Sequence, residues 1–145
     1  MKSIFSIELD KDGNGHGDIR LTIAPLNEVF EMDSYYFAHS DNSPRLSAQI
    51  RRLLEEWKEA VISMKERDTL YLIIDFSDQY FGGLKCELHN DTLNLTYGVI
   101  RNSTKLNYDN VIHDLKGCEF QAYQIFNVNQ TIFLGSIDLN IMNFL

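Results

Sequence analysis

The stretch that decides the fold is TLYLIIDFSDQYFGGLKCELHNDTLNLTYGVIR, residues Thr69–Arg101. Two runs within it alternate apolar and polar residues with a period of two, which is the pattern of half-buried β-strands. A two-residue turn at Asn90 and Asp91 brings the apolar positions of the two runs opposite one another. The predicted pairs are Leu88 with Leu93, Cys86 with Leu95, and Leu84 with Tyr97. Because this register puts all six side chains on one face, the stretch predicts a β-hairpin.

The segments before the hairpin add further strands. Alternating apolar residues predict two strands near the N-terminus, at residues 5–9 and 19–23, joined by a glycine-rich turn. Pro25 ends the second of these, and an irregular segment is expected to run to Asn42. The almost continuous apolar run at 70–74 is typical of a central strand that is covered on both faces.

A single helix is clearly indicated between these strands. Ser43 suits the N-cap and Pro44 suits the first helical position. Apolar residues then recur with helical spacing, at Leu46, Ile50, Leu53, Leu54, Trp57, Ala60, Val61 and Met64. This stripe predicts an amphipathic helix that packs on a sheet.

The last third of the chain has mixed patterns. A short helix is expected at 108–116, followed by strands at 119–126, 131–137 and 139–144. Taken together, the elements predict an α+β fold, a mainly antiparallel sheet with one long amphipathic helix packed on one face. The length of 145 residues suits a single globular domain, residues 1–145.

Composition limits the classes of function. A formal net charge of −8 argues against a protein that binds the phosphate backbone of nucleic acid. The N-terminus lacks the continuous apolar core of a signal peptide, and no apolar run reaches membrane-spanning length. Cys86 and Cys118 have neither disulfide-framework nor metal-ligand spacing, so free thiols in a reducing compartment are expected. We therefore expect a cytoplasmic protein without a cofactor.

An acidic, aromatic segment lies before the helix. Between Leu21 and Pro44 there are four carboxylates and no lysine or arginine. The acidic residues are Glu28, Glu31, Asp33 and Asp41, and the aromatic residues are Phe30, Tyr35, Tyr36 and Phe37. This combination suits a docking surface for a basic protein, because opposite charge speeds encounter and aromatic rings supply anchors. The alternative is a solvated loop whose aromatic rings pack on the sheet.

A second candidate follows the central strand. Asp75 and Asp78 are three residues apart and precede Tyr80 and the Gly82-Gly83 pair. Two carboxylates can act as an acid and base or hold a divalent metal, but no His, Lys or Arg between Leu70 and Leu84 completes such a site. A structural turn or a contact loop is therefore favoured over catalysis, and the chain is not expected to be an enzyme.

The turn between the first two strands resembles the first half of an EF-hand calcium loop. Asp10, Asp12 and Asn14 occupy the positions of the first three oxygen ligands, and Asp18 occupies a fourth. The bidentate glutamate that closes such a loop is replaced by Leu21. Because Asp, Asn and Gly also favour tight hairpin turns, a structural turn is preferred over a calcium site.

The block LIIDFSDQYFGGLKCELHNDTLNLTYG, residues 72–98, together with the small acidic chain, resembles the immunity proteins encoded beside bacterial polymorphic and contact-dependent growth inhibition toxins. The resemblance implies a cytoplasmic, non-enzymatic protein that binds one cognate toxin C-terminal domain, often a nuclease, at its active site or substrate surface. The contacts then expected are Glu31, Asp33, Tyr35, Tyr36, Asp75, Asp78 and Tyr80. A structural or adaptor protein and a calcium-binding protein remain the alternatives.

Overall fold

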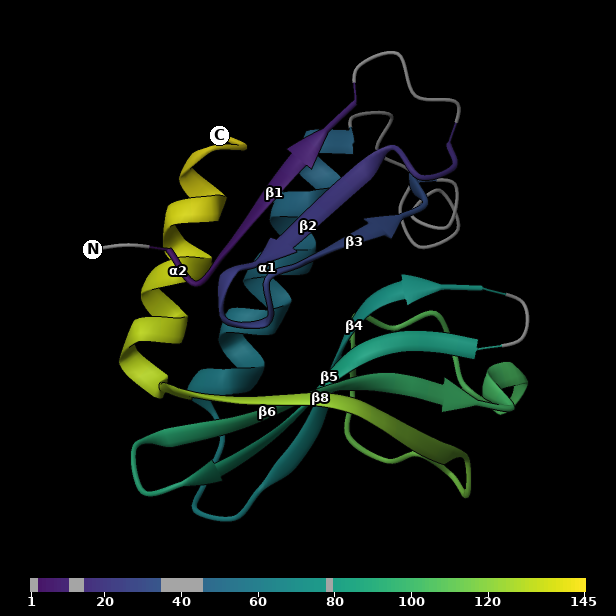
Figure 1. Cartoon of the computed structure of the whole chain (residues 1–145), viewed down its shortest axis with the longest axis vertical. Helices are drawn as coiled ribbons and strands as arrows, with labels where there is room; N and C mark the ends of the chain where they lie inside the picture. The colour runs from purple at the N-terminus through teal and green to yellow at the C-terminus, as the bar shows by residue number, and fades with distance from the viewer. Residues whose placement is uncertain (1–2, 11–14, 35–45, 78–79) are drawn as a thin grey trace.

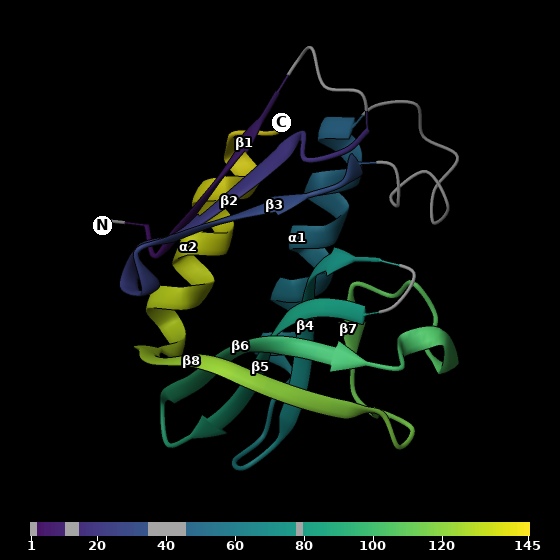
Figure 2. The same ribbon diagram turned by 45° about the vertical axis from the view of Figure 1, so that its right-hand side comes forward.

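The computed structural model describes residues 3–10, 15–34, 46–77 and 80–145. It contains two antiparallel sheets and two helices, which confirms the α+β class (Figure 1). The strands form two sheets where the sequence predicted one. The helices α1 and α2 lie side by side behind the three-stranded sheet (Figures 1 and 2). The larger cluster of buried side chains contains residues from both sheets and both helices.

The N-terminal sheet has the strand order β1-β2-β3. Strands β1 (Phe5–Leu9) and β2 (Ile19–Ile23) lie at the predicted positions. Strand β3 (Glu28–Met32) lies in the segment that was predicted to be irregular, so that prediction was wrong. Two glutamates among its five residues, together with an exposed Val29, hide the alternation that marks a strand. A short 3₁₀ turn, η1 (Ala24–Leu26), joins β2 to β3.

The C-terminal sheet has five strands in the order β7-β4-β5-β6-β8. Their bounds are β4 Thr69–Phe76, β5 Tyr80–His89, β6 Thr92–Arg101, β7 Val111–Ile112 and β8 Glu119–Asn129. The hairpin β5–β6 has the predicted register, including the pairs Leu88 with Leu93, Cys86 with Leu95 and Leu84 with Tyr97. Asn90 adopts a left-handed conformation, φ 48°, in the predicted two-residue turn.

Helix α1 (Leu46–Ile62) buries the predicted stripe. Its buried residues are Ile50, Leu53, Leu54, Trp57 and Val61. Ser43 and Pro44, the expected start of the helix, lie outside the described residues. The Trp57 indole Nε1 donates a hydrogen bond to the carbonyl of Asn110, 3.2 Å away, which ties α1 to the segment before β7.

The end of the chain differs from the prediction. Helix α2 (Gln130–Met142) replaces the strands expected at 131–137 and 139–144. Apolar residues are spread around this helix, so the sequence shows no amphipathic stripe. The side chain of Asn129 caps it by accepting hydrogen bonds from the backbone N–H groups of Thr131 and Ile132. The strand predicted at 119–126 is confirmed and continues to Asn129.

The helix predicted at 108–116 is also wrong, since this segment holds strand β7 at the edge of the sheet. The carbonyl of Asn110 accepts hydrogen bonds from both the Ile73 backbone and the Trp57 side chain, which holds the segment extended. Cys86 and Cys118 are buried and free, as expected. In the ranges that the structure describes, no helix is long and apolar enough to cross a membrane.

Candidate functional site

Two of the acidic segments singled out from the sequence meet at the junction of the two sheets. Asp33 directly follows β3, Asp75 lies in β4, and these two strands are in contact. Burial raises the pKa of Asp75 to about 7, and the negative charge of Asp33 adds to this shift. Hydrogen bonds from the backbone of Phe76 and Asp33 act in the opposite direction without cancelling it.

Local backbone irregularity sets the position of Asp75. The register between β4 and β5 shifts between Ile73 and Asp75, so Asp75 pairs with Gly82. A Cβ atom on Gly82 would lie 3.6 Å from the Cβ of Asp75 and 3.5 Å from the hydroxyl oxygen of Tyr97. The Asp75 oxygen Oδ1 is buried and has no hydrogen-bond partner among the described residues. Asp75 is therefore an incompletely satisfied carboxylate between the two sheets.

Aromatic rings lie beside this carboxylate. The ring centroids of Phe30 and Tyr97 are 4.2 Å apart, and those of Tyr97 and Tyr123 are 6.3 Å apart. Burial raises the pKa of Tyr97, and the charge of Asp75 raises it further, with smaller contributions from Tyr80, Tyr123 and Glu28. We call this set the acidic–aromatic surface; it consists of Glu28, Phe30, Asp33, Asp75, Tyr80, Tyr97 and Tyr123.

The structure brings together only some of the contact residues that the sequence suggested. Asp33, Asp75 and Tyr80 all belong to the acidic–aromatic surface. Glu31 pairs with Arg20 in the β2–β3 ladder and, by strand alternation, points to the opposite face from Phe30. Tyr35, Tyr36 and Asp78 lie outside the described residues.

The sequence marked Glu28 as part of the acidic segment without listing it among the expected contacts, and it did not single out Tyr97 or Tyr123 for this site. Tyr97 looked like an ordinary core residue of the hairpin, and Tyr123 lay in a strand whose faces could not be assigned. The signal that would have found Tyr97 is its place in β6 at the end of an otherwise aliphatic row, where Leu95 and Leu93 precede it. A tyrosine at such a position needs a polar environment for its hydroxyl group.

The turn between β1 and β2 supports Asp33. Asp18 is buried, and its carboxylate accepts hydrogen bonds from the backbone and hydroxyl groups of Ser34. Burial alone would raise the pKa of Asp18, but its hydrogen bonds, those from Ser34 before those from the backbone of Asp18 and Gly15, together outweigh this effect and hold the pKa below its ordinary value. The backbone N–H of Gly17 donates to Asp33 Oδ1 at 2.6 Å. The turn thus fixes the end of β3 and the position of Asp33.

The same turn contains the residues considered for calcium. Asp12 and Asn14 lie outside the described residues, and Asp18 is bonded to Ser34. The backbone N–H of Asp10 donates to the Asp18 carbonyl at 2.8 Å, which closes the hairpin across the turn. Among the residues described, no group of three or more His, Cys, Asp or Glu side chains is placed to hold a metal ion. The described residues of this turn therefore close the β1–β2 hairpin.

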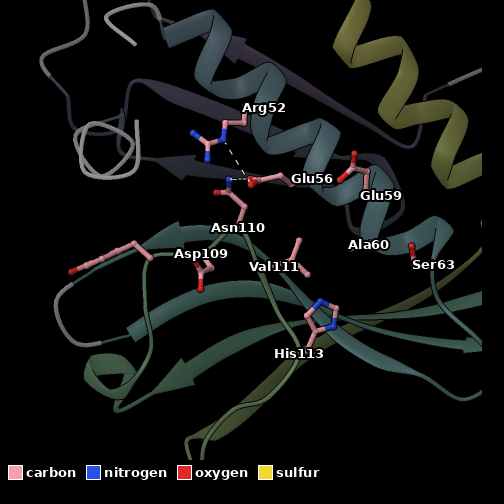
Figure 3. Close-up of a pocket in the computed structure, with 10 residues that line it drawn as sticks. Arg52, Glu56, Glu59, Ala60, Ser63, Asp109, Asn110, Val111 and His113 are labelled. Carbon is pink, nitrogen blue, oxygen red and sulfur yellow. Dashed lines mark hydrogen bonds and ion pairs between the residues drawn. The ribbon is translucent and has the colours of Figure 1, made fainter. Parts of the chain in front are cut away.

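A cleft of about 710 Å³ lies elsewhere, between α1 and the segment that leads into β7 (Figure 3). Its charged lining residues are Arg52, Glu56, Glu59, Asp109 and His113. Arg52 and Glu56 form an ion pair at 3.8 Å, and the side chain of Asn110 also donates to Glu56. An enzyme that used Asp75 would need a pocket that joins this carboxylate to a histidine, and Asp75 does not line this cleft.

The acidic–aromatic surface has the chemistry of a protein-binding site. Its carboxylates attract cations, and its rings offer flat apolar area next to polar hydroxyl groups. Two of the segments that form it are distant in sequence, the one with Glu28, Phe30 and Asp33 and the one with Asp75 and Tyr80, and both stand out in the sequence for acidic and aromatic residues. No protein-family model, curated protein or solved structure matches this chain.

Proposed function

We propose that this chain is a cytoplasmic immunity protein that binds and neutralises a basic toxin domain through its acidic–aromatic surface. The observation that carries the proposal is the approach of Asp33 to Asp75 beside the tilted, closely packed rings of Phe30 and Tyr97. The resemblance of residues 72–98 to immunity proteins gives the class of partner.

The energetics of Asp75 favour an external cation. A carboxylate that is largely buried next to another carboxylate is in an unfavourable field, since both desolvation and like charge oppose ionisation. In the part of the chain that the structure describes, no lysine or arginine forms an ion pair with Asp75. A partner that presents basic side chains along Asp33 and Glu28 would offset the negative potential at Asp75. Binding would then lower the cost of ionising Asp75.

Net charge supports the same type of partner. With a formal charge of −8, the chain attracts a basic domain from a distance and accelerates their encounter. Nuclease toxins carry basic surfaces because they bind phosphates. An acidic inhibitor with aromatic anchors covers such a surface, while the buried free thiols of Cys86 and Cys118 suit the reducing cytoplasm.

Co-expression tests the proposal. The probe is the C-terminal domain encoded by the reading frame immediately upstream of this gene, purified with and without this chain. We expect a stable complex and loss of the toxic activity in the complex. A complex that leaves the activity intact would instead make the chain an adaptor. The absence of any complex would reject the proposal.

A further inference from the structure

Strand β8 forms one edge of the five-stranded sheet and is its longest strand, with 11 residues. One side of β8 is paired with β6 from Glu119 to Asn129, apart from a register shift at Tyr123. On the other side, no strand pairs with β8 among the residues described. Figure 2 shows β8 running along the near edge of the sheet. Its outward backbone N–H and C=O groups are therefore available to another extended chain.

The edge at β1 is closed in a different way. Helix α2 covers it, and two polar side chains of this helix bond to the strand backbone. Ser136 Oγ accepts from the N–H of Ile4 at 2.8 Å, and Asn140 Oδ1 accepts from the N–H of Ile7 at 3.2 Å. The Asn140 amide also donates to the carbonyl of Phe5 at 2.9 Å. The fold thus protects the edge at β1 and leaves the edge at β8 open.

The two remaining edges are short. Strand β7 has two residues, and β3 has five, two of which are glutamates. Short or charged edge strands are a common protection against pairing with another chain. In contrast, β8 contains no lysine, arginine or proline, and Glu119 at its start is its one charged residue.

The N-terminal half of β8 is the accessible part. The turn containing η1 approaches the other half of the strand, which leads into α2 (Figures 1 and 2). In the accessible half, Tyr123 and Ile125 are 53% and 68% exposed. A strand added at this edge would place its own side chains against Tyr123 on one face and against Ile125 on the other.

This edge adjoins the acidic–aromatic surface. The β6–β8 ladder contains a register shift at Tyr97 and Gly98, and Tyr123 is the unpaired residue of β8 at this point. The ring of Tyr123 lies 6.3 Å from that of Tyr97. A chain that pairs with β8 would therefore pass directly beside the rings and carboxylates of the surface.

We propose that an extended segment of the basic partner adds to the sheet as a sixth strand along Glu119–Ile125. This inference rests on the proposed function. Backbone hydrogen bonds hold the added strand, and its alternate side chains contact Tyr123 on one face and Ile125 on the other. A second copy of this chain is a weaker occupant, because each copy carries a net charge of −8.

Hydrogen exchange measured on the complex with the upstream-encoded C-terminal domain tests this directly. In the free protein, outward amides of residues 119–125 are expected to exchange rapidly, and in the complex they are expected to become protected. A complex that inhibits the toxin but leaves these amides unprotected would reject strand addition and keep the proposed function. Failure to form a complex would reject both. Protection of these amides in free protein that sediments as a dimer would assign the edge to self-pairing.

Substitutions at Ile125 give a second test with a matched control. We expect Ile125→Lys and Ile125→Glu each to weaken binding at least about tenfold, because a charge on the edge opposes strand addition whatever its sign. The control is Thr96→Lys, because Thr96 pairs with Ile125 on the adjacent inner strand and lies on the same face. Weakening by Ile125→Lys with unchanged binding by Ile125→Glu would show charge repulsion alone and overturn the proposal.

Discussion

Asp75 in β4 lies close enough to Asp33, beyond the end of β3, for the charge of Asp33 to raise the pKa of Asp75. This pair joins two segments from different sheets, and each had been selected from sequence for its acidic and aromatic residues. Their proximity turns two separate candidates into one surface. It also means that ionisation of Asp75 should make the free energy of unfolding depend on pH.

We expect Asp75→Asn to remove a pH-dependent loss of stability. The pKa of Asp75 is about 7 in the folded protein and 3.8 without the influence of the fold. Between these values the folded state holds a proton that the unfolded state has released, so the free energy of unfolding falls as pH rises. Because solvent reaches part of the group, the loss amounts to roughly 1–2 kcal/mol at pH 8.

Chemical denaturation at pH 4.5 and pH 8 checks this. The Asn variant should be more stable than the wild type at pH 8, with a smaller difference at pH 4.5. Glu59→Gln, which changes an exposed carboxylate of the cleft on α1, is the control and should show no such trend. Equal pH dependence of wild type and Asp75→Asn would contradict an unfavourable environment at Asp75.

A glycine in β6 is required by the packing of the outer face of the sheet. A Cβ atom at Gly98 would lie 2.3 Å from the Gln121 carbonyl oxygen and 2.6 Å from Phe120 Cζ. We expect Gly98→Ala to lower the free energy of unfolding by about 3 kcal/mol. At Gly82 the nearest atoms to an added Cβ are 3.5 and 3.6 Å away. Gly82→Ala should therefore change the free energy of unfolding by less than about 1 kcal/mol. Thermal unfolding of the two variants measures the difference. Similar losses of stability for both would argue against close packing at Gly98.

Because α2 closes the β1 edge through Asn140, we expect substitution of this buried polar residue to lower stability strongly. Asn140 is 2% exposed and bonds to the backbone of both Ile7 and Phe5. Asn140→Ala leaves these buried groups without partners, which costs about 2–3 kcal/mol. Asn127→Ala, at an exposed position in β8, should cost less than about 0.5 kcal/mol. Urea denaturation of the two variants measures the difference, and an Asn140→Ala variant as stable as Asn127→Ala would disprove the edge-closing role.

Ser34→Ala tests the link between the β1–β2 turn and β3. The hydroxyl of Ser34 donates to the buried carboxylate of Asp18, and its removal should cost about 1–2 kcal/mol at pH 7. Because the pKa of Asp18 is lowered in the folded state, this contribution is present above pH 4 and is lost as pH falls through the folded pKa. The difference between wild type and variant should thus shrink toward pH 3. Ser63→Ala, at an exposed position, is the control. A stability difference between wild type and Ser34→Ala that stays constant down to pH 3 would be inconsistent with this role of Asp18.

The elements with regular patterns were predictable from the sequence. The β5–β6 register follows from matched apolar faces, and α1 follows from its buried stripe. The short strand β3 and helix α2 were not predictable from such patterns. Helix α2 buries Ser136 and Asn140 and exposes Leu139 and Met142, so tertiary hydrogen bonds to β1 outweigh amphipathic order.

The candidate site was predictable in character and only partly in membership. Acidic and aromatic composition selected Asp33, Asp75 and Tyr80, but a single sequence does not show that β3 approaches β4. Strand alternation separates Glu31 from Phe30, which became evident only once β3 was known to be a strand. Tyr97 and Tyr123 join the site through a register shift that no sequence pattern announced.

The most direct test of the central claim measures association with the proposed partner, the C-terminal domain encoded by the reading frame immediately upstream, at low and high salt. The variant Glu28→Lys/Asp33→Lys removes negative charge from the acidic–aromatic surface, and Glu55→Lys/Glu59→Lys makes the same charge change on α1. We expect the first variant to associate at least about tenfold more slowly than the second at low salt, with the gap narrowing at high salt. Equal association rates for the two variants would contradict binding through this surface.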